Sequence, residues 1–242
     1  MVKKLLFLLF CISISHFVMS QIETWRVEIS LNDRLILPFF IEEENIKNEV
    51  MRYSVKNGDE KIPLNFQALK NDTIQLSFKE MSSHLKIIYT DSNHFLGFWI
   101  DERKASKYPI SGVRGAFKRF ESTAVTSSKK IHPSYEIVFG RDKSKWPAIG
   151  LFKQRGDVLT GTFLTETGDY RYLEGNVFGD QLYLSCFDGA HAFVFTAKIF
   201  GDSLAGKFYS GPNYKTDWSG ITTMDNSFPI YESNFYLQLL RR

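Results

Sequence analysis

The chain contains little cysteine: its 242 residues include only Cys11 and Cys186. Neither belongs to a C-x-x-C pair, and only Cys186 remains beyond residue 20, so an internal disulfide, a dithiol redox centre and a thiolate zinc site are excluded there. The motifs H-E-x-x-H, G-x-G-x-x-G and G-x-S-x-G are also absent. The residue patterns therefore identify no catalytic residue, no cofactor site and no metal site.

The sequence also lacks a long hydrophobic run. Residues 1–20 begin with Lys3 and Lys4, continue through a short apolar run, and end on Ser20, which is the layout of a secretory signal peptide. A bilayer-spanning helix needs about 20 apolar residues. We therefore expect secretion to the periplasm or cell envelope, with no integral membrane span after signal removal. A retained anchor is the alternative, and the bulky residue before Cys11 disfavours lipidation there.

An excess of charge is missing as well. Once the predicted signal peptide is removed, 28 of the 30 basic residues stand against 27 acidic residues. Binding of nucleic acid requires a concentrated basic field, so the sequence predicts no nucleic-acid partner. Two short basic clusters, formed by Arg114, Lys118 and Arg119 and by residues 129–130, are interpreted as solvated faces or loops.

Aromatic residues, by contrast, are abundant. They make up 15% of a chain that is long enough for one large β domain or two small ones with a buried core. Beyond residue 150, Gly and Asp occur together at intervals of 10 to 12 residues, which is the spacing of short strands joined by tight turns. These pairs are Gly156-Asp157, Gly168-Asp169, Gly179-Asp180, Asp188-Gly189 and Gly201-Asp202. The pattern predicts an antiparallel meander.

Both faces of this meander are largely apolar. In residues 182–187 one face carries Leu, Leu and Cys and the other carries Tyr, Ser and Phe, and residues 192–199 repeat the pattern. A sheet with two apolar faces must close into a barrel or pack as a sandwich to shield them from water. We expect an all-β fold of this kind, with Cys186 buried as an inert thiol.

The first half of the chain is also predicted to be β, with hairpin turns at Asn57-Gly58-Asp59 and Asn71-Asp72. One or two helical turns are expected around residues 42–49. The strand candidates are residues 25–31, 34–41, 50–55, 73–78, 85–90 and 95–100.

Residues 105–133 form a basic, Ser/Thr-rich connection. The connection is either a boundary between two β subdomains or a long loop within one domain. We divide the chain into a signal peptide (1–20), an N-terminal β region (21–110), a C-terminal antiparallel meander (111–220) and a tail (221–242).

Histidine is the first candidate for a base or a metal ligand. No histidine pair beyond residue 20 has the spacing of a metal site, and three of the four are interpreted as structural, namely His84, His94 and His132. His191 shares a tight turn with Asp188, close to Cys186, a set from which a nucleophile or a binding surface can be built. We favour a turn role for Asp188, whose carboxylate would satisfy local backbone donors, and retain Asp188 and His191 as a candidate interaction surface.

Two further groups of side chains have the residue types of a functional site. Asp180 and Asp188 would be the acid and base of a glycosidase, but both are turn residues. Five aromatic residues suit core positions or, alternatively, an aromatic binding wall: Trp146, Trp218, Tyr170, Tyr172 and Tyr209.

Three segments carry a resemblance to a known family: GTFL (161–164), TGDYRYLEG (167–175) and LSCFDGAHAF (184–193). This stretch resembles the region that precedes the thioredoxin fold in secreted TlpA-like redoxin proteins of Gram-negative bacteria. The resemblance covers residues 150–220 well and the first half loosely. In that family the disulfide chemistry belongs to a W-C-x-x-C motif in a C-terminal thioredoxin domain, and no such motif follows Cys186 here.

The resemblance implies a non-catalytic accessory β domain of the cell envelope that binds an unknown protein or a small ligand. We therefore expect that this chain is not an enzyme. One alternative is a carrier that holds an apolar small ligand in an aromatic barrel interior. A hydrolase that uses Asp188 and His191 is the least favoured alternative.

Overall fold

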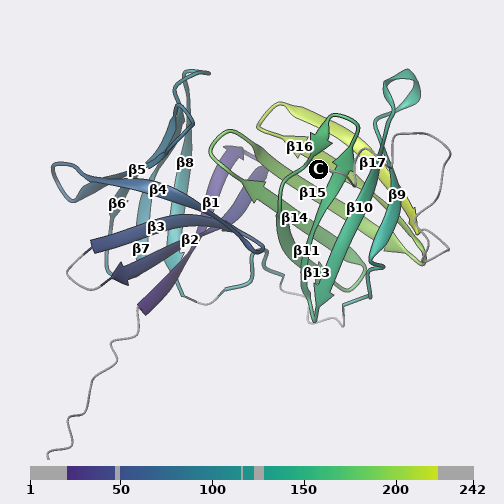
Figure 1. Cartoon of the computed structure of the whole chain (residues 1–242), viewed down its shortest axis with the longest axis horizontal. Coiled ribbons are helices and arrows are strands. Elements are labelled where there is room, and N and C mark those ends of the chain that lie inside the picture. The colour runs from purple at the N-terminus through teal and green to yellow at the C-terminus, as the bar shows by residue number, and fades with distance from the viewer. Residues whose placement is uncertain (1–20, 47–49, 116, 123–127, 223–242) are drawn as a thin grey trace, which may run out of the picture.

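The computed structural model describes residues 21–46, 50–115, 117–122 and 128–222. In this part of the chain, seventeen β-strands and one 3-10 turn, η1 (Asp142–Ser144), form two closed antiparallel barrels (Figure 1). The predicted all-β fold with two β subdomains is confirmed, and closure occurs by barrels. The predicted signal peptide and residues 223–242 of the predicted tail lie outside the described residues.

Barrel 1 consists of eight strands that follow the chain order around the ring. They are β1 (Gln21–Asn32), β2 (Leu35–Ile46), β3 (Val50–Asn57), β4 (Glu60–Ala68), β5 (Thr73–Phe78), β6 (Ser83–Tyr89), β7 (His94–Asp101) and β8 (Ser106–Arg114). Pairing of β1 with β8 closes the ring. The predicted hairpin turn at Gly58-Asp59 joins β3 to β4, and Gly58 has a φ of +57°, which a two-residue turn of this kind requires.

Barrel 2 is closed by pairing of β10 with β11. Its ring order is β10-β9-β17-β16-β15-β14-β13-β11, and the short β12 pairs antiparallel with the end of β11. The strands are β9 (Ser134–Phe139), β10 (Trp146–Arg155), β11 (Val158–Thr165), β12 (Gly168–Asp169), β13 (Leu173–Phe178), β14 (Gln181–Phe187), β15 (Ala192–Phe200), β16 (Ser203–Ser210) and β17 (Tyr214–Thr222).

Three of the predicted Gly-Asp turns connect neighbouring strands of barrel 2. Gly156-Asp157, Gly179-Asp180 and Gly201-Asp202 each join two strands directly, and the three glycines have φ of +64°, +57° and +58°. Positive φ at the first residue of a two-residue turn matches the twist of the flanking strands, and glycine adopts it without strain. Gly168-Asp169 differs from the prediction, because it forms β12 rather than a turn.

The prediction of a helix around residues 42–49 is wrong for residues 42–46, which continue β2. The acidic side chains alternate across the strand: Glu43 accepts a hydrogen bond from the Trp25 indole at 2.6 Å, inside the barrel. On the outside, Glu42 pairs with Lys61. Tertiary pairing thus outweighs the local helical tendency. Residues 106–114, expected to belong to a loose connection, form β8.

The interior of barrel 2 is filled by its own aromatic side chains. Phe163 and Phe195 have ring centroids 4.8 Å apart, and Phe195 stacks on Phe208 at 4.5 Å. Phe139 and Trp218 pack against the same cluster. Cys186 lies in this core with no exposed surface, as predicted, and burial raises the pKa of its thiol.

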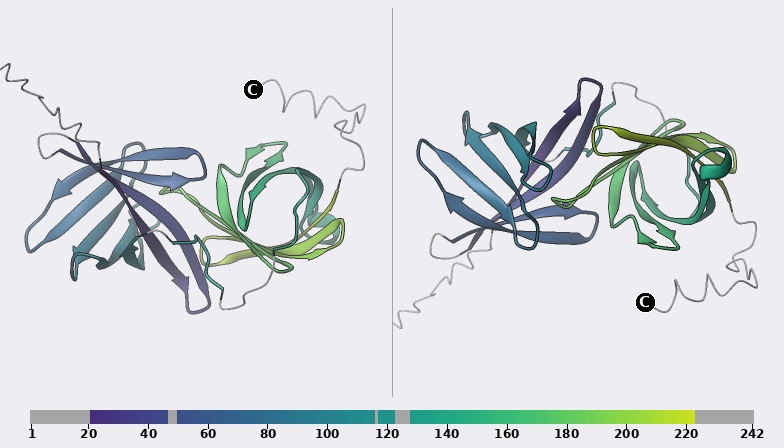
Figure 2. Two further views of the ribbon diagram at one scale, coloured as in Figure 1. Left: turned by 90° about the horizontal axis from the view of Figure 1, so that it is seen from below. Right: turned by 90° about the horizontal axis from the view of Figure 1, so that it is seen from above.

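Barrel 1 has an interior that barrel 2 completes. The core of barrel 1 includes Phe187 and two neighbours from β15 of barrel 2. The Phe187 ring lies 4.6 Å from Phe39, 5.5 Å from Phe78 and 5.0 Å from Trp99. The outer face of β14 therefore caps one end of barrel 1, and Figure 2 shows the barrels in this contact with the purple β1–β2 hairpin beside barrel 2.

A buried polar network also joins the barrels. The Arg119 side chain, in the connection between them, donates to Ser185 Oγ at 2.8 Å, Asn57 Oδ1 at 2.6 Å and the Lys56 carbonyl oxygen at 3.1 Å. Arg119 Nη1 also donates a hydrogen bond to Glu174 Oε2 at 3.3 Å. The interpretation of Arg119 as part of a solvated face is wrong, since only 2% of the residue is exposed. Its burial is tolerated because these partners satisfy its donors.

Candidate functional site

The turn between β14 and β15 contains Asp188 and His191, the pair proposed from the sequence. Asp188 Oδ1 accepts hydrogen bonds from the backbone N–H groups of Ala190 at 2.9 Å and His191 at 2.7 Å. Its other oxygen lies 2.9 Å from His191 Nδ1. Although burial raises the pKa of Asp188, these hydrogen bonds outweigh burial and hold it below its ordinary value. The carboxylate thus fixes the turn, and the His191 ring remains half exposed.

The other sequence candidates are dispersed. Cys186 points into barrel 2 while His191 binds Asp188 outside it, so the structure does not bring the thiol and the imidazole together. Asp180 and Asp188 lie at opposite ends of β14, roughly 25 Å apart along an extended strand. His84 pairs with Glu102 at 3.3 Å, His94 with Asp91 at 2.9 Å and His132 with Asp202 at 3.6 Å. Among the described residues, no group of three or more His, Cys, Asp or Glu side chains is arranged to hold a metal ion.

Four of the five candidate aromatic residues are core or packing residues. Trp218 is buried in barrel 2, and Trp146 and Tyr170 pack against the same core. Tyr209 packs against the core of barrel 1. Tyr172 differs, since 56% of it is exposed beside a hollow at the junction of the barrels.

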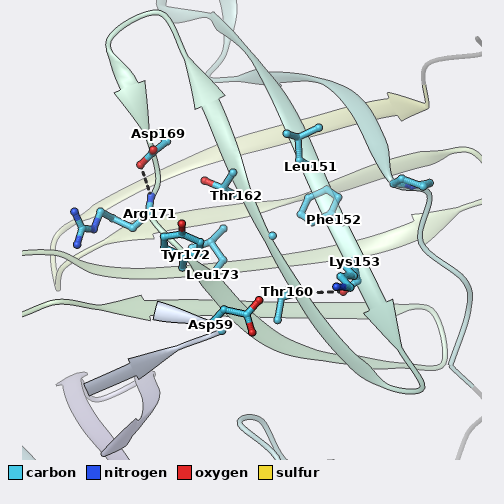
Figure 3. A pocket seen from close by; sticks show the side chains of 13 residues that line it. Asp59, Leu151, Phe152, Lys153, Thr160, Thr162, Asp169, Arg171, Tyr172 and Leu173 are labelled. Carbon is cyan, nitrogen blue, oxygen red and sulfur yellow. Dashed lines mark hydrogen bonds between the residues drawn. The ribbon is translucent and has the colours of Figure 1, made fainter. Parts of the chain in front are cut away.

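This hollow, the seam pocket, has a volume of about 400 Å³ (Figure 3). Strands β10 and β11 supply its floor through Leu151, Thr160 and Thr162. The β3–β4 turn of barrel 1 adds Asp59, so both barrels contribute to the walls. The remaining lining residues are Gly58, Pro133, Phe152, Lys153, Gly161, Asp169, Arg171, Tyr172 and Leu173.

One wall of the seam pocket is held in a strained conformation. Arg171 has a φ of +62°, which costs a residue with a Cβ about 1 kcal/mol. The Arg171 backbone N–H donates to Asp169 Oδ1 at 2.9 Å (Figure 3), and its guanidinium donates to Glu60 of barrel 1 at 2.9 Å. Arg171 Nε also lies 3.5 Å from Asp188. These partners fix the wall to barrel 1 and to the β14–β15 turn.

Some polar atoms near this wall have no hydrogen-bond partner in the described part of the chain. Within the described residues, Thr162 Oγ1 of the floor and Glu60 Oε2 behind Arg171 are buried without a hydrogen-bond partner. Burial raises the pKa of Glu60, and the carboxylates of Asp188 and Asp169 add to this shift while Arg171 opposes it. Buried polar atoms without partners are costly, so the free energy of folding carries a penalty at Thr162 and Glu60.

His191 lines a second hollow, of about 760 Å³, on the other side of the same turn. Barrel 1 contributes Trp99 and Tyr108, whose rings stack at 5.0 Å, and barrel 2 contributes Tyr214. Asp188 therefore contacts a residue of each hollow, Arg171 on one side and His191 on the other. The sequence identified the turn but not the seam pocket, because the outward side chains of β10 and β11 have no motif that separates them from ordinary solvated residues.

Comparisons with known proteins find no matching protein-family model and no matching curated protein. Among solved structures, a protein assigned to the outer membrane of Bacteroides fragilis NCTC 9343 has 9% identity and a TM-score of 0.28, covering 84% of this chain and 97% of its own. A variant of transferrin binding protein B from Haemophilus parasuis Hp5 has 8% identity and a TM-score of 0.25, covering 79% and 65%. An intact transferrin binding protein B with N and C lobes has 10% identity and a TM-score of 0.24, covering 89% and 69%.

None of these three is a TlpA-like redoxin protein, so the comparisons give no support to the resemblance of residues 161–193 to that family. At these identities and TM-scores, the similarity carries no inference about function. Within the described residues, no helix has the length and apolar character needed to cross a membrane.

Proposed function

We propose that this protein is a non-catalytic binding protein of the cell envelope and that it takes a small polar ligand in the seam pocket. The signal-like start of the chain supports the envelope assignment. The observation that carries the binding assignment is the pocket between the barrels, whose walls are tied together by the Arg119 network and by the Arg171 ion pairs. A site that is fixed before binding loses little conformational freedom when the ligand enters.

The pocket composition suits a ligand with one apolar face and several hydroxyl or amide groups. Tyr172 offers an exposed ring, Leu151 an apolar floor, and Thr160 a hydroxyl. Lys153 and Asp59 add one charge of each sign at the rim. A few polar groups set among apolar ones are typical of small-molecule sites, and the volume lies in their usual range.

The aromatic packing of barrel 2 favours this external site over a carrier with an internal ligand. The Phe139, Phe163, Phe195 and Phe208 rings contact one another within the barrel, where such a ligand would lie. A single buried thiol also supports a role outside disulfide exchange, since one thiol cannot form the intramolecular disulfide that releases a mixed-disulfide intermediate. We expect insulin reduction by the chain to equal that of Cys186→Ala.

The proposed function is tested by a thermal-shift screen of the chain from residue 21 against monosaccharides, disaccharides, amino acids and dipeptides. Compounds that raise the melting temperature are then titrated against Thr160→Trp, which fills the pocket from the outer face of β11, and against Tyr172→Ala. Tyr214→Ala in the second hollow is the matched control. We expect the shifts to disappear in the first two variants and to persist in the control. Shifts that survive Thr160→Trp, or no shift with any compound, would contradict the proposal.

A further inference from the structure

The outer face of β6, β7 and β8 carries exposed apolar side chains that lie next to one another. Leu96 is 57% exposed, Ile88 48% and Phe98 37%. Ile88 and Leu96 are cross-strand partners, and Phe98 follows two residues later on the same face of β7, opposite Pro109 of β8. Side chains on one face of neighbouring strands are within contact distance, so these four residues form a continuous surface, here named the β6–β8 face.

Lysines border this apolar surface. Lys86 is the cross-strand partner of Phe98, and the Lys107 ammonium lies 3.6 Å from the Phe98 ring centroid. The outward positions of these three strands, all of them described, include no Asp or Glu. They are His84, Lys86, Ile88, His94, Leu96, Phe98, Ile100, Lys107, Pro109, Ser111 and Val113.

Carboxylates lie at the ends of this face and along its β8 side, where Glu28 of β1 is the cross-strand partner of Ser111 and forms an ion pair with Arg26 at 2.7 Å. Glu102 pairs with His84 and Asp91 with His94, both from the turns beside β7. The inward Asp101 is buried. Between these ends the exposed charge is entirely positive, so an anionic partner meets no opposing carboxylate at the centre of the face.

The β6–β8 face points away from the rest of the protein. The strands of barrel 2 pack mainly against β2 and β3 of barrel 1, and β6 and β7 lie four strands further round an eight-stranded ring. Phe187 reaches Trp99 of β7 from inside the ring, on the face opposite to Leu96 and Phe98. Since every strand of the closed ring is paired on both sides, a partner cannot dock here by adding a strand and must contact side chains.

From these observations we propose that the β6–β8 face docks on a membrane surface that carries anionic lipids. Leu96, Ile88 and Phe98 would enter the boundary between headgroups and acyl chains, while Lys86 and Lys107 contact lipid phosphates. The commitment to lipid rests on the charge pattern, because apolar side chains bordered by lysines and free of carboxylates are complementary to an anionic interface. The docked face would leave the seam pocket open to solvent.

The test is sedimentation of the chain from residue 21, so that the apolar leader is absent, with vesicles of phosphatidylcholine alone or with 30% phosphatidylglycerol. We expect binding to the anionic vesicles only. The double variants Leu96→Ser/Phe98→Ser and Lys86→Glu/Lys107→Glu should each reduce the bound fraction at least about tenfold. Phe200→Ser/Ile221→Ser, which removes two exposed apolar side chains from barrel 2, is the matched control and should bind like the wild type.

Equal melting temperatures would show that the variants fold. Absence of binding, equal binding to both vesicle types, or binding that only the barrel 2 control abolishes would overturn the proposal. A concentration-dependent dimer that Leu96→Ser/Phe98→Ser dissociates would also overturn it, in favour of contact between two copies of the chain.

Discussion

Barrel 2 fills its interior with its own aromatic side chains, whereas barrel 1 takes part of its core from barrel 2. Phe187 makes this difference, because it leaves the outer face of β14 and enters the end of barrel 1 between Phe39, Phe78 and Trp99. The interior residues of the barrel 2 core cluster all belong to residues 131–218. Two barrels of equal strand number can therefore differ in how far each depends on the other. The stability of barrel 1 should depend on barrel 2 more than the stability of barrel 2 depends on barrel 1.

The largest effect is expected for Phe187→Ala. Truncation of a buried Phe costs about 4 kcal/mol through lost burial and the cavity that remains. Because the ring serves barrel 1, that barrel should unfold at lower urea concentration than barrel 2. Tryptophan fluorescence distinguishes them, since Trp25 and Trp99 report on barrel 1 and Trp146 and Trp218 on barrel 2. Phe200→Ala on the exposed face of β15 is the control, and coincident loss of both barrels in Phe187→Ala would argue against the one-way dependence.

The next largest effect is expected for Arg119→Met. Removing one member of a buried ion pair leaves its partners, here Glu174 and Asn57, buried without their donor. The loss should lower the free energy of unfolding by about 3 kcal/mol. Lys118→Met, one residue earlier in the same connection, removes a surface ion pair with Asp157 and a cation–π contact with the Phe178 ring, and should cost less than about 1 kcal/mol. Urea unfolding measures both. Equal costs would mean that the buried network does not join the barrels.

A smaller effect is expected for Gly189→Ala, in the turn that meets barrel 1. Gly189 has a φ of +89°, and a Cβ there would lie 2.5 Å from the Phe78 ring. The substitution should cost about 2 kcal/mol from backbone strain and the clash. Gly201→Ala is the matched control, because Gly201 has a φ of +58° with open space around it and should cost about 1 kcal/mol. The difference between the two melting temperatures isolates the contact with barrel 1.

The smallest effect concerns the pH dependence of Asp188. Its pKa in the folded protein lies below the ordinary value of 3.8, so its contribution is fully present above that value and is lost as the pH falls through the folded pKa. Asp188→Asn should therefore be less stable than the wild type at pH 7, by about 1 kcal/mol, and the gap should narrow below about pH 4. Urea unfolding at pH 7, 4 and 3 measures it, with His191→Ala expected to be near neutral. Parallel stability curves would refute the role of the Asp188 carboxylate.

The same comparison shows what could be predicted from the sequence. Barrel 2 was predicted well because its two-residue turns require glycine at positive φ, as at Gly156 and Gly179, and this requirement is visible as a recurring pair. The alternation in residues 182–187 also predicted the buried thiol of Cys186. In barrel 1, β8 was missed because its residues resemble those of a loop, and the acidic end of β2 was mistaken for a helix.

The junction could not be predicted for a different reason. Arg119 looks like any basic residue in a linker, and its burial arises only when Asn57, Glu174 and Ser185, distant in sequence, converge on it. Phe187 was correctly assigned to the face opposite Cys186, but nothing local indicates that this face enters a second barrel. The turn containing Asp188 was identified, while the seam pocket depends on Asp59 of barrel 1 approaching β11 of barrel 2.

Hydrogen exchange resolved by segment tests the one-way dependence most directly, with the wild type, Phe187→Ala and Phe163→Ala compared under native conditions. Phe163 lies in the barrel 2 core and does not contact the barrel 1 core cluster. The account predicts that Phe187→Ala speeds exchange in β5 to β7 and leaves β9, β10 and β17 unchanged, whereas Phe163→Ala speeds exchange in both barrels, since opening of barrel 2 withdraws the Phe187 ring. Faster exchange confined to barrel 2 in Phe163→Ala, or spread equally over both barrels in Phe187→Ala, would contradict it.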